Sequence, residues 1–227
     1  LDNVTWSNQM QAFAESLGSA EQPYIPVNFA TDPRSTAGQA SYNSSGADIS
    51  RWPSNLGLAA TFDLGTMEKF SALVSAEYRA LGITSAISPQ IDLATDPRWL
   101  RTEGTFGENV ELTSALAAAN VTGFQGSTGS DGWGPESINA MIKHWVGEGP
   151  GEGGREPHTF AGKYSVFPGG NFDTHTLAFL GALDSASVMT SYSILLDANG
   201  DPLFADRTGA AYDMGRIALL REQYEGV

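Results

Sequence analysis

The 227-residue sequence contains no cysteine, which excludes disulfide bonds, thiol nucleophiles and thiolate metal sites together. It also lacks any apolar run near the roughly 20 residues that a membrane-spanning helix needs. Basic residues are scarce, since 12 Lys and Arg against 26 Asp and Glu give a formal net charge of −14. Because a phosphate backbone requires a basic surface, we expect no nucleic-acid partner and no membrane partner.

Motifs for the common cofactors are missing as well. No GxGxxG or GxxxxGK[ST] sequence lies at an expected strand-to-helix junction, which removes the main support for a dinucleotide or P-loop site. The three histidines show no HExxH or comparable metal-ligand spacing. We therefore expect no cofactor and no metal site.

Short apolar segments alternate with longer segments of helical periodicity. We expect strands at residues 24–29 (YIPVNF), 83–87 (ITSAI), 140–145 (AMIKHW) and 187–193 (SVMTSYS). We expect helices at residues 63–81, 108–120, 175–183 and 210–224. Asp63 is placed to cap the first of these helices, and Gly82 to end it. Strands that alternate with helices predict a parallel sheet.

Polar residues collect at or just after the expected strand ends, namely Asp32, Asp92, Arg98, Arg101, Lys143, His144 and Tyr192. This arrangement is typical of a (β/α) barrel, in which the loops after the strands form the site. We therefore expect an α/β fold, a (β/α)8 TIM-barrel-like domain that is incomplete, with roughly six βα units. Residues 1–227 are expected to form part of one such domain, without a second domain.

Barrel closure requires about eight strands, and an open barrel exposes two sheet edges. We expect the remainder of a longer chain, or a second complementing chain, to supply the missing units. The sequence is also compatible with a homo-oligomer.

Five segments, in order, resemble the N-terminal barrel domain of glycoside hydrolase family 3. They are IPVNFATD, WPSNLGLAATFD, SPQIDLATDPRWLRTEGTFGEN, IKHWVGEGPGEGGR and SVMTSYS. The resemblance extends from about Ile25 to the end of the chain. It implies a retaining β-glucosidase-like enzyme that hydrolyses terminal non-reducing β-D-glucosyl residues of oligosaccharides or β-glucosides. By the same resemblance we expect a periplasmic or secreted protein.

The resemblance assigns five substrate-binding residues. Asp32 would accept hydrogen bonds from hydroxyls of the non-reducing sugar. Arg101, Lys143 and His144 would donate to the ring hydroxyls, and Tyr192 would lie beside the reacting centre. These side chains suit a pyranose because each hydroxyl both donates and accepts a hydrogen bond. Hydrogen bonds to charged groups contribute about 1.5–3 kcal/mol each. Carboxylates and a ligand would also satisfy the buried ammonium of Lys143.

The sequence departs from the family pattern at several positions. Leu100 stands where glycine is usual, and the segment after Asp32 lacks the usual HG, which weakens the assignment of that aspartate. Arg98 is expected to build the loop by pairing with a carboxylate such as Asp96 or Glu103. The glycine-rich loop after residue 146 is longer than the motif needs and is expected to shape the pocket entrance.

No catalytic residue can be assigned within residues 1–227. The resemblance implies that the nucleophile is an Asp of an (S/T)DW triplet a few residues after Val227, and that the acid/base is a Glu further on. Two alternatives stay open. One is a β-N-acetylglucosaminidase of the same family, with His158 as a candidate acid/base, and the other is a non-catalytic carbohydrate-binding relative.

Overall fold

The computed structural model describes residues 2–33, 35–37, 49–126, 133–204 and 207–223. The α-helices are α1 (Asp2–Ser16), α2 (Asn55–Ala59), α3 (Leu64–Ala80), α4 (Val110–Gln125), α5 (Phe172–Leu177) and α6 (Met214–Gln223). The strands are β1 (Ala30–Thr31), β2 (Ser85–Ala86), β3 (Asn139–Trp145), β4 (Tyr164–Val166), β5 (Ser187–Thr190) and β6 (Ile194–Leu196). None of the helices in these ranges is long and apolar enough to cross a membrane.

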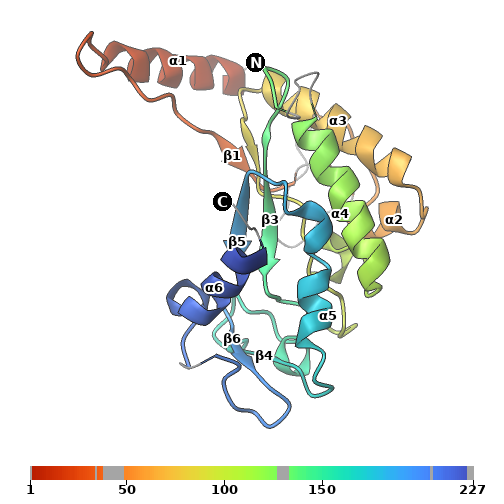
Figure 1. Cartoon of the computed structure of the whole chain (residues 1–227). Helices are drawn as coiled ribbons and strands as arrows, with labels where there is room; N and C mark the ends of the chain where they lie inside the picture. Colours follow the sequence, from red (N-terminus) through yellow and green to blue (C-terminus); the bar gives the residue numbers. More distant parts are fainter. Residues whose placement is uncertain (1, 34, 38–48, 127–132, 205–206, 224–227) are drawn as a thin grey trace.

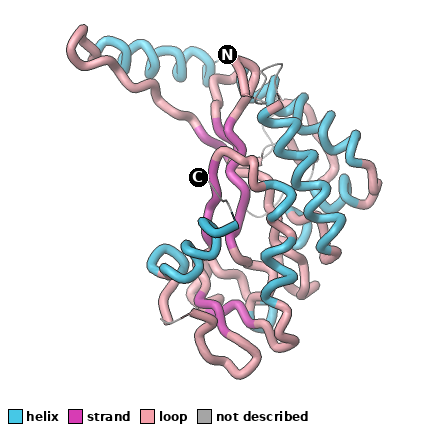
Figure 2. Tube along the Cα trace, in the orientation of Figure 1, coloured by secondary structure: helices cyan, strands magenta, loops and turns pink. Residues whose placement is uncertain are grey.

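A parallel sheet of four strands, in the order β1-β2-β3-β5, forms the centre of the molecule. Helices α3 and α4 connect successive strands and lie together on one side of the sheet (Figures 1 and 2). Strands in sequence order joined by helices are the repeating βα unit of a TIM-barrel-like fold, so the expected fold class is confirmed.

The number of barrel strands differs from the expectation of about six. Among the described residues, β4 and β6 pair with each other in a separate two-stranded parallel sheet. This second sheet lies beyond the carboxyl ends of the main strands (Figure 1). Strand β4 lies in the glycine-rich segment after Trp145, which the sequence analysis expected to be a loop, and β6 follows the expected strand at residues 187–193. The main sheet therefore contains four described strands.

Helices α3 and α4 supply much of the apolar core. Asp63 caps α3 as predicted, because its Oδ1 accepts a hydrogen bond from the backbone N–H of Gly65 at 2.9 Å. Met67 and Leu116 are fully buried between the two helices and the sheet. At Gly123 of α4, a Cβ atom would lie 2.4 Å from the carbonyl oxygen of Glu68. The close approach of the two helices therefore requires glycine at that position.

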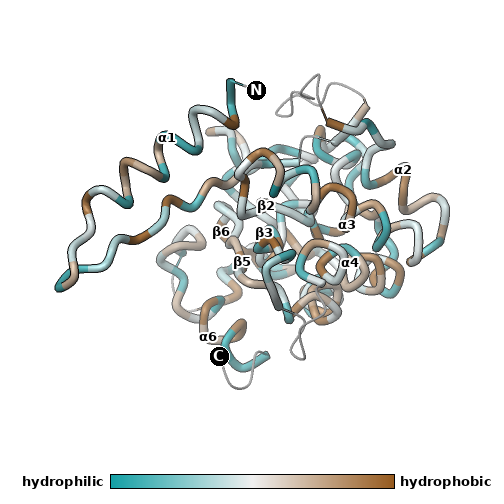
Figure 3. Tube along the Cα trace, turned by 90° about the horizontal axis from the view of Figure 1, so that it is seen from above, coloured by the Kyte–Doolittle hydropathy of each residue, from teal (hydrophilic) through white to brown (hydrophobic). Residues whose placement is uncertain are grey.

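The expected first strand, residues 24–29, is wrong. The structure places β1 at Ala30–Thr31, and the preceding segment is irregular with Tyr24 and Ile25 exposed. Pro26 has no N–H group to donate to a strand ladder, which accounts for the late start. Helix α1, which the sequence analysis did not predict, extends away from the rest of the molecule in both views (Figures 1 and 3).

Candidate functional site

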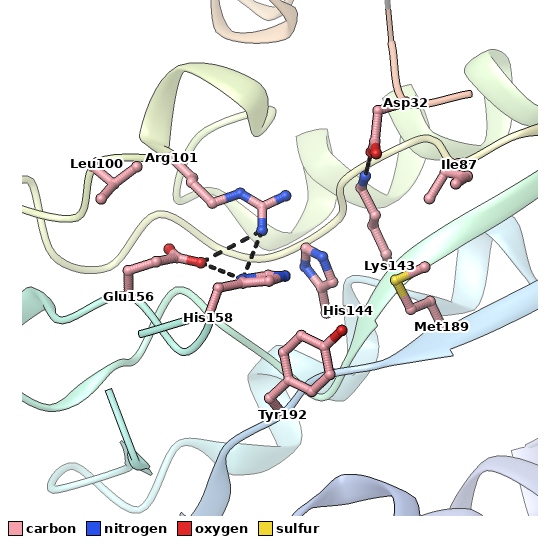
Figure 4. Close-up of a pocket in the computed structure, with 10 residues that line it drawn as sticks. All are labelled: Asp32, Ile87, Leu100, Arg101, Lys143, His144, Glu156, His158, Met189 and Tyr192. Carbon is pink, nitrogen blue, oxygen red and sulfur yellow. Dashed lines mark hydrogen bonds and ion pairs between the residues drawn. The ribbon is translucent and has the colours of Figure 1, made fainter. Parts of the chain in front are cut away.

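A pocket of about 400 Å³ opens at the carboxyl ends of the main strands. Its described lining residues are Asp32, Ile87, Leu100, Arg101, Lys143, His144, Glu156, His158, Met189 and Tyr192 (Figure 4). All five residues expected to bind substrate are among them. They meet because parallel strands present their carboxyl ends at the same edge of the sheet. Their role as sugar ligands stays a prediction.

Lys143 lies near the carboxyl end of β3 and is only 3% exposed. Its Nζ contacts Asp32 Oδ1 at 2.5 Å, so the carboxylate expected to satisfy the ammonium is present. Burial lowers the pKa of Lys143, and the charge of Asp32 opposes that effect. The Asp32 side chain is 43% exposed. It therefore holds Lys143 and also faces the pocket.

His144 is oriented from behind by Asp92, which is itself buried. The distance from His144 Nδ1 to Asp92 Oδ2 is 2.7 Å. Burial works to raise the pKa of Asp92, but His144, the backbone N–H of Glu148 and the charge of Arg101 together outweigh it and the pKa is lowered. Burial also lowers the pKa of His144, which favours the neutral ring. Because an ionised Asp92 accepts from Nδ1–H, Nε2 is left as an acceptor, whereas the sequence analysis expected His144 to donate.

Arg101 is buried and bound by carboxyl groups that the sequence analysis did not single out. Its Nη1 donates to Glu148 Oε2 at 3.2 Å and lies 3.5 Å from Glu156 Oε1. Its Nη2 donates to Gln90 Oε1 at 3.2 Å. Glu148 and Glu156 come from the glycine-rich loop after β3, which has no periodic pattern. The buried guanidinium of Arg101 is the one signal that points to them, since a buried cation requires an anion and further hydrogen-bond acceptors around it.

Glu148 is fully buried within this group of charges. Burial, followed by the negative charge of Asp92, raises its pKa to about 9. The carboxyl is therefore protonated at neutral pH. In that form it still accepts the Arg101 hydrogen bond without adding another buried negative charge.

His158 lies on the pocket wall beside Tyr192, with the two ring centroids 4.8 Å apart and the rings perpendicular. Its Nδ1 is in close contact with Glu156 Oε1. A carboxylate at this position accepts from Nδ1–H, which leaves Nε2 of His158 facing the pocket (Figure 4). The same Glu156 accepts a 2.5 Å hydrogen bond from Trp99 Nε1 through its other oxygen.

Potential ligand atoms of His144, Glu148 and His158 lie within 4.8 Å of one another, as in a metal site. However, Arg101 Nη1 lies 3.2 Å from both Glu148 Oε2 and His158 Nδ1. A guanidinium is permanently charged and would face any bound cation at short range. These described residues therefore do not fit a metal ion.

Two further expectations concern the loop that carries Arg101. Arg98 pairs with Asp96, with 2.6 Å between Nη2 and Oδ2, so its expected pairing is confirmed. Leu100, which stands where the family has glycine, lies half-exposed on the pocket wall. The departure from the family pattern thus adds an apolar side chain to the site.

A parallel βα sheet with charged side chains gathered beyond its carboxyl ends is the arrangement of a TIM-barrel-like domain. Residues 2–210 match the model of the glycosyl hydrolase family 3 N terminal domain, and the chain belongs to this family.

Relatives agree with this assignment, and a solved structure agrees with the fold. The chain is 40% identical over 224 residues to a periplasmic beta-glucosidase/beta-xylosidase of Dickeya chrysanthemi, covering 96% of this chain and 33% of that protein. It is 40% identical over 172 residues to beta-glucosidase C of Emericella nidulans, covering 74% and 27%. The crystal structure of an exo-1,3/1,4-beta-glucanase from a Pseudoalteromonas species superimposes with a TM-score of 0.75 at 23% identity, covering 98% and 26%. The chain thus spans about a third of the length of the first relative and about a quarter of the length of the second.

Proposed function

We propose that this chain supplies the sugar-binding half of the active site of a retaining β-glycosidase. The enzyme would release terminal non-reducing β-D-glucosyl residues from oligosaccharides or β-glucosides. The observation that carries the proposal is the meeting of Arg101, His144 and the Lys143–Asp32 pair in one pocket. The names of two relatives, a beta-glucosidase/beta-xylosidase and a beta-glucosidase, support the reaction, and the periplasmic name of the first supports a periplasmic or secreted location.

The arrangement suits a pyranose because donors and acceptors alternate around the pocket. Lys143 and Arg101 donate, whereas Asp32 and the Nε2 atom of neutral His144 accept. Because these groups are held by ion pairs and hydrogen bonds within the protein, their side chains are already oriented before a sugar binds. An analogue that lacks one hydroxyl would leave a buried polar group unpaired, so the site would discriminate against it.

The catalytic carboxyls are proposed to lie outside residues 1–227. A retaining glycosidase uses two carboxyl groups about 5–5.5 Å apart. Asp32 is paired with Lys143, and Asp92 and Glu148 are buried behind the pocket, so none of these three suits the role of nucleophile. The relatives are about three times longer than the matched region and have room for the missing groups. The outer edges of β1 and β5 would accept the closing strands, from the same chain or a second one.

A pair of lysine variants tests the proposal in the product of the complete gene. Lys143→Met removes the buried ammonium, and Lys163→Met removes an exposed one near Phe160. A lost hydrogen bond from a charged donor, worth about 1.5–3 kcal/mol, corresponds to a roughly 10- to 150-fold lower kcat/KM for an aryl β-glucoside. The Lys163 variant should match the wild type. An inactive wild type, or a fully active Lys143 variant, would contradict the proposal.

One observation favours a second candidate, the β-N-acetylglucosaminidase. The close Glu156–His158 pair leaves a ring nitrogen facing the pocket, which is the arrangement of a carboxylate-oriented histidine acid/base. His158→Ala should be assayed on an aryl β-glucoside and on an aryl N-acetyl-β-glucosaminide. Unchanged glucoside turnover excludes His158 as the acid in glucoside hydrolysis, and selective loss of glucosaminide turnover favours the second candidate. Sugar binding without turnover of either substrate would instead identify a non-catalytic relative.

A further inference from the structure

Arg216 of α6 is fully buried and binds the chain on both sides of Tyr192. Its Nη1 donates to Ser191 Oγ at 2.9 Å, and its Nη2 donates to the carbonyl oxygen of Ser193 at 2.8 Å. Tyr192 itself is 64% exposed. Contacts of its own side chain with a surrounding core therefore do little to fix it, and the backbone held on either side determines where the ring lies.

The same network extends to the end of β3. Ser193 Oγ lies 2.7 Å from Ser165 Oγ, which donates to the carbonyl oxygen of Gly147 at 2.9 Å. The backbone N–H of Ser191 donates to the carbonyl oxygen of Trp145 at 2.8 Å. These serines are buried, so each hydrogen bond is shielded from water. The segment that carries Tyr192 is thus tied to the strand that carries Lys143 and His144.

The network returns to α6 through Trp145. Its Nε1 donates to the carbonyl oxygen of Arg216 at 3.1 Å. Arg216 therefore binds the Tyr192 segment through its side chain and β3 through its backbone. Arg216 is thus hydrogen-bonded both to the segment that carries Tyr192 and to the strand that carries Lys143.

Burying this guanidinium is costly, which makes its position informative. Its acidic neighbour is Asp213, whose Oδ2 lies 3.5 Å from Nε. Burial lowers the pKa of Arg216 to about 10, so the group remains charged at neutral pH. An apolar side chain of similar volume would fill the same space without the desolvation cost. Unlike an apolar side chain, arginine donates hydrogen bonds to both residue 191 and residue 193.

We infer that Arg216 is a positioning residue that fixes Tyr192 against His158 at the wall of the sugar-binding pocket. The inference rests on the proposed function, because the role of Tyr192 toward a sugar is itself proposed. Arg216 does not line the pocket, so any effect on the ligand passes through Tyr192 and the end of β3.

A double-mutant cycle in the product of the complete gene tests this inference. Arg216→Gln should lower kcat/KM for an aryl β-glucoside about tenfold to hundredfold, because small misplacements of positioned groups have effects of that size. In a Tyr192→Ala background, the same substitution should lower kcat/KM less than twofold. Arg221→Gln, an exposed arginine of the same helix, should match the wild type. Equal losses from Arg216→Gln in both backgrounds would overturn the inference, because they would indicate a purely structural role.

A second measurement does not depend on turnover. In protein labelled with fluorotyrosine, the fluorine resonance of Tyr192 is assigned by its absence in Tyr192→Phe. Arg216→Gln should shift or broaden this resonance and leave those of the other tyrosines unchanged. Ser191→Ala removes one of the two acceptors of Arg216 and should alter the Tyr192 resonance in the same way but to a smaller extent. This variant provides the test if Arg216→Gln does not fold. An unaltered Tyr192 resonance would overturn the inference even in an active enzyme, and an altered one supports it even if no glycosidase activity is found.

Discussion

Replacing Glu148 by glutamine removes the one buried carboxyl of the described site whose protonation the structure favours at neutral pH. Its Oε2 lies 3.2 Å from both Arg101 Nη1 and His144 Nδ1, and its pKa is raised from 4.5 to about 9. Between those two pH values the folded protein holds a proton that the unfolded chain has lost. By linkage, stability falls as pH rises through this window.

The magnitude follows from the size of the shift. One pKa unit corresponds to about 1.36 kcal/mol, so the extra proton on Glu148 of the folded protein makes the free energy of unfolding fall by about 2 kcal/mol between pH 7 and pH 9. For a domain of about 150–250 residues, a loss of this size lowers Tm by about 4–8 °C. Burial lowers the pKa of His144, so the contribution of this residue to the free energy of unfolding changes only below pH 6.5, the ordinary pKa of histidine. The lowered pKa values of Asp92 and Glu156 act at still lower pH. The lowered pKa of Lys143 has the opposite effect, because it makes the free energy of unfolding rise as pH approaches 10.5.

Thermal unfolding followed by circular dichroism at pH 7, 8 and 9 would measure this dependence. Glutamine has the shape of a protonated glutamate and does not ionise, so the Tm of Glu148→Gln should change much less with pH than that of the wild type. Glu152→Gln, an exposed glutamate four residues further along the loop, should retain the wild-type dependence. Parallel curves for wild type and Glu148→Gln would refute the assignment of the proton to Glu148.

Two further predictions concern stability and use matched controls, each measured by urea unfolding at pH 7. Arg101→Met should lower the free energy of unfolding by about 3–5 kcal/mol, because it leaves the buried carboxylate of Glu156 without the guanidinium. Arg98→Met breaks only an exposed ion pair and should leave the unfolding midpoint unchanged. Equal midpoints for the two variants would contradict this prediction. Leu116→Ala leaves a cavity at a fully buried site between α3, α4 and the sheet and should lower the free energy of unfolding by about 2–5 kcal/mol. Leu73→Ala, at a position that is 45% exposed, should lower it by less than about 0.5 kcal/mol. Similar losses for the two variants would show that the helix interface is misplaced.

Local signals in the sequence were sufficient for the elements that bury one regular face. Helix α3 is flanked by Asp63 and Gly82 and repeats apolar residues every three or four positions, and the structure places it at Leu64–Ala80. The long polar-ended strand is also found, at Asn139–Trp145. Once strands and helices alternate in a parallel sheet, strand ends must meet at one edge. The convergence of Arg101 with Lys143 therefore follows from topology and not from any local pattern.

Other features depend on contacts between distant segments and have no local signal. The small β4–β6 sheet pairs two three-residue strands, Tyr164–Val166 and Ile194–Leu196, which are too short to show a period. Asp92 lies among the polar strand-end residues of the sequence, but its contact with His144 joins positions 52 residues apart. The tautomer of His144, and with it the change from donor to acceptor, depends on that contact.

The glycine-rich loop after β3 illustrates why composition alone is a poor guide to burial. Its many glycines suggest a solvent-exposed loop that shapes the pocket entrance, yet Glu148 and Glu156 within it are buried beneath Arg101. Glycine is needed there for space, because a Cβ atom at Gly149 would lie 1.7 Å from the carbonyl oxygen of Leu93. The absence of side chains lets the backbone approach the loop after β2 and bring two carboxyl groups to the guanidinium. In this chain the glycines allow the ion pair with Glu156 and the hydrogen bond with Glu148 that let the guanidinium of Arg101 remain inside the pocket wall.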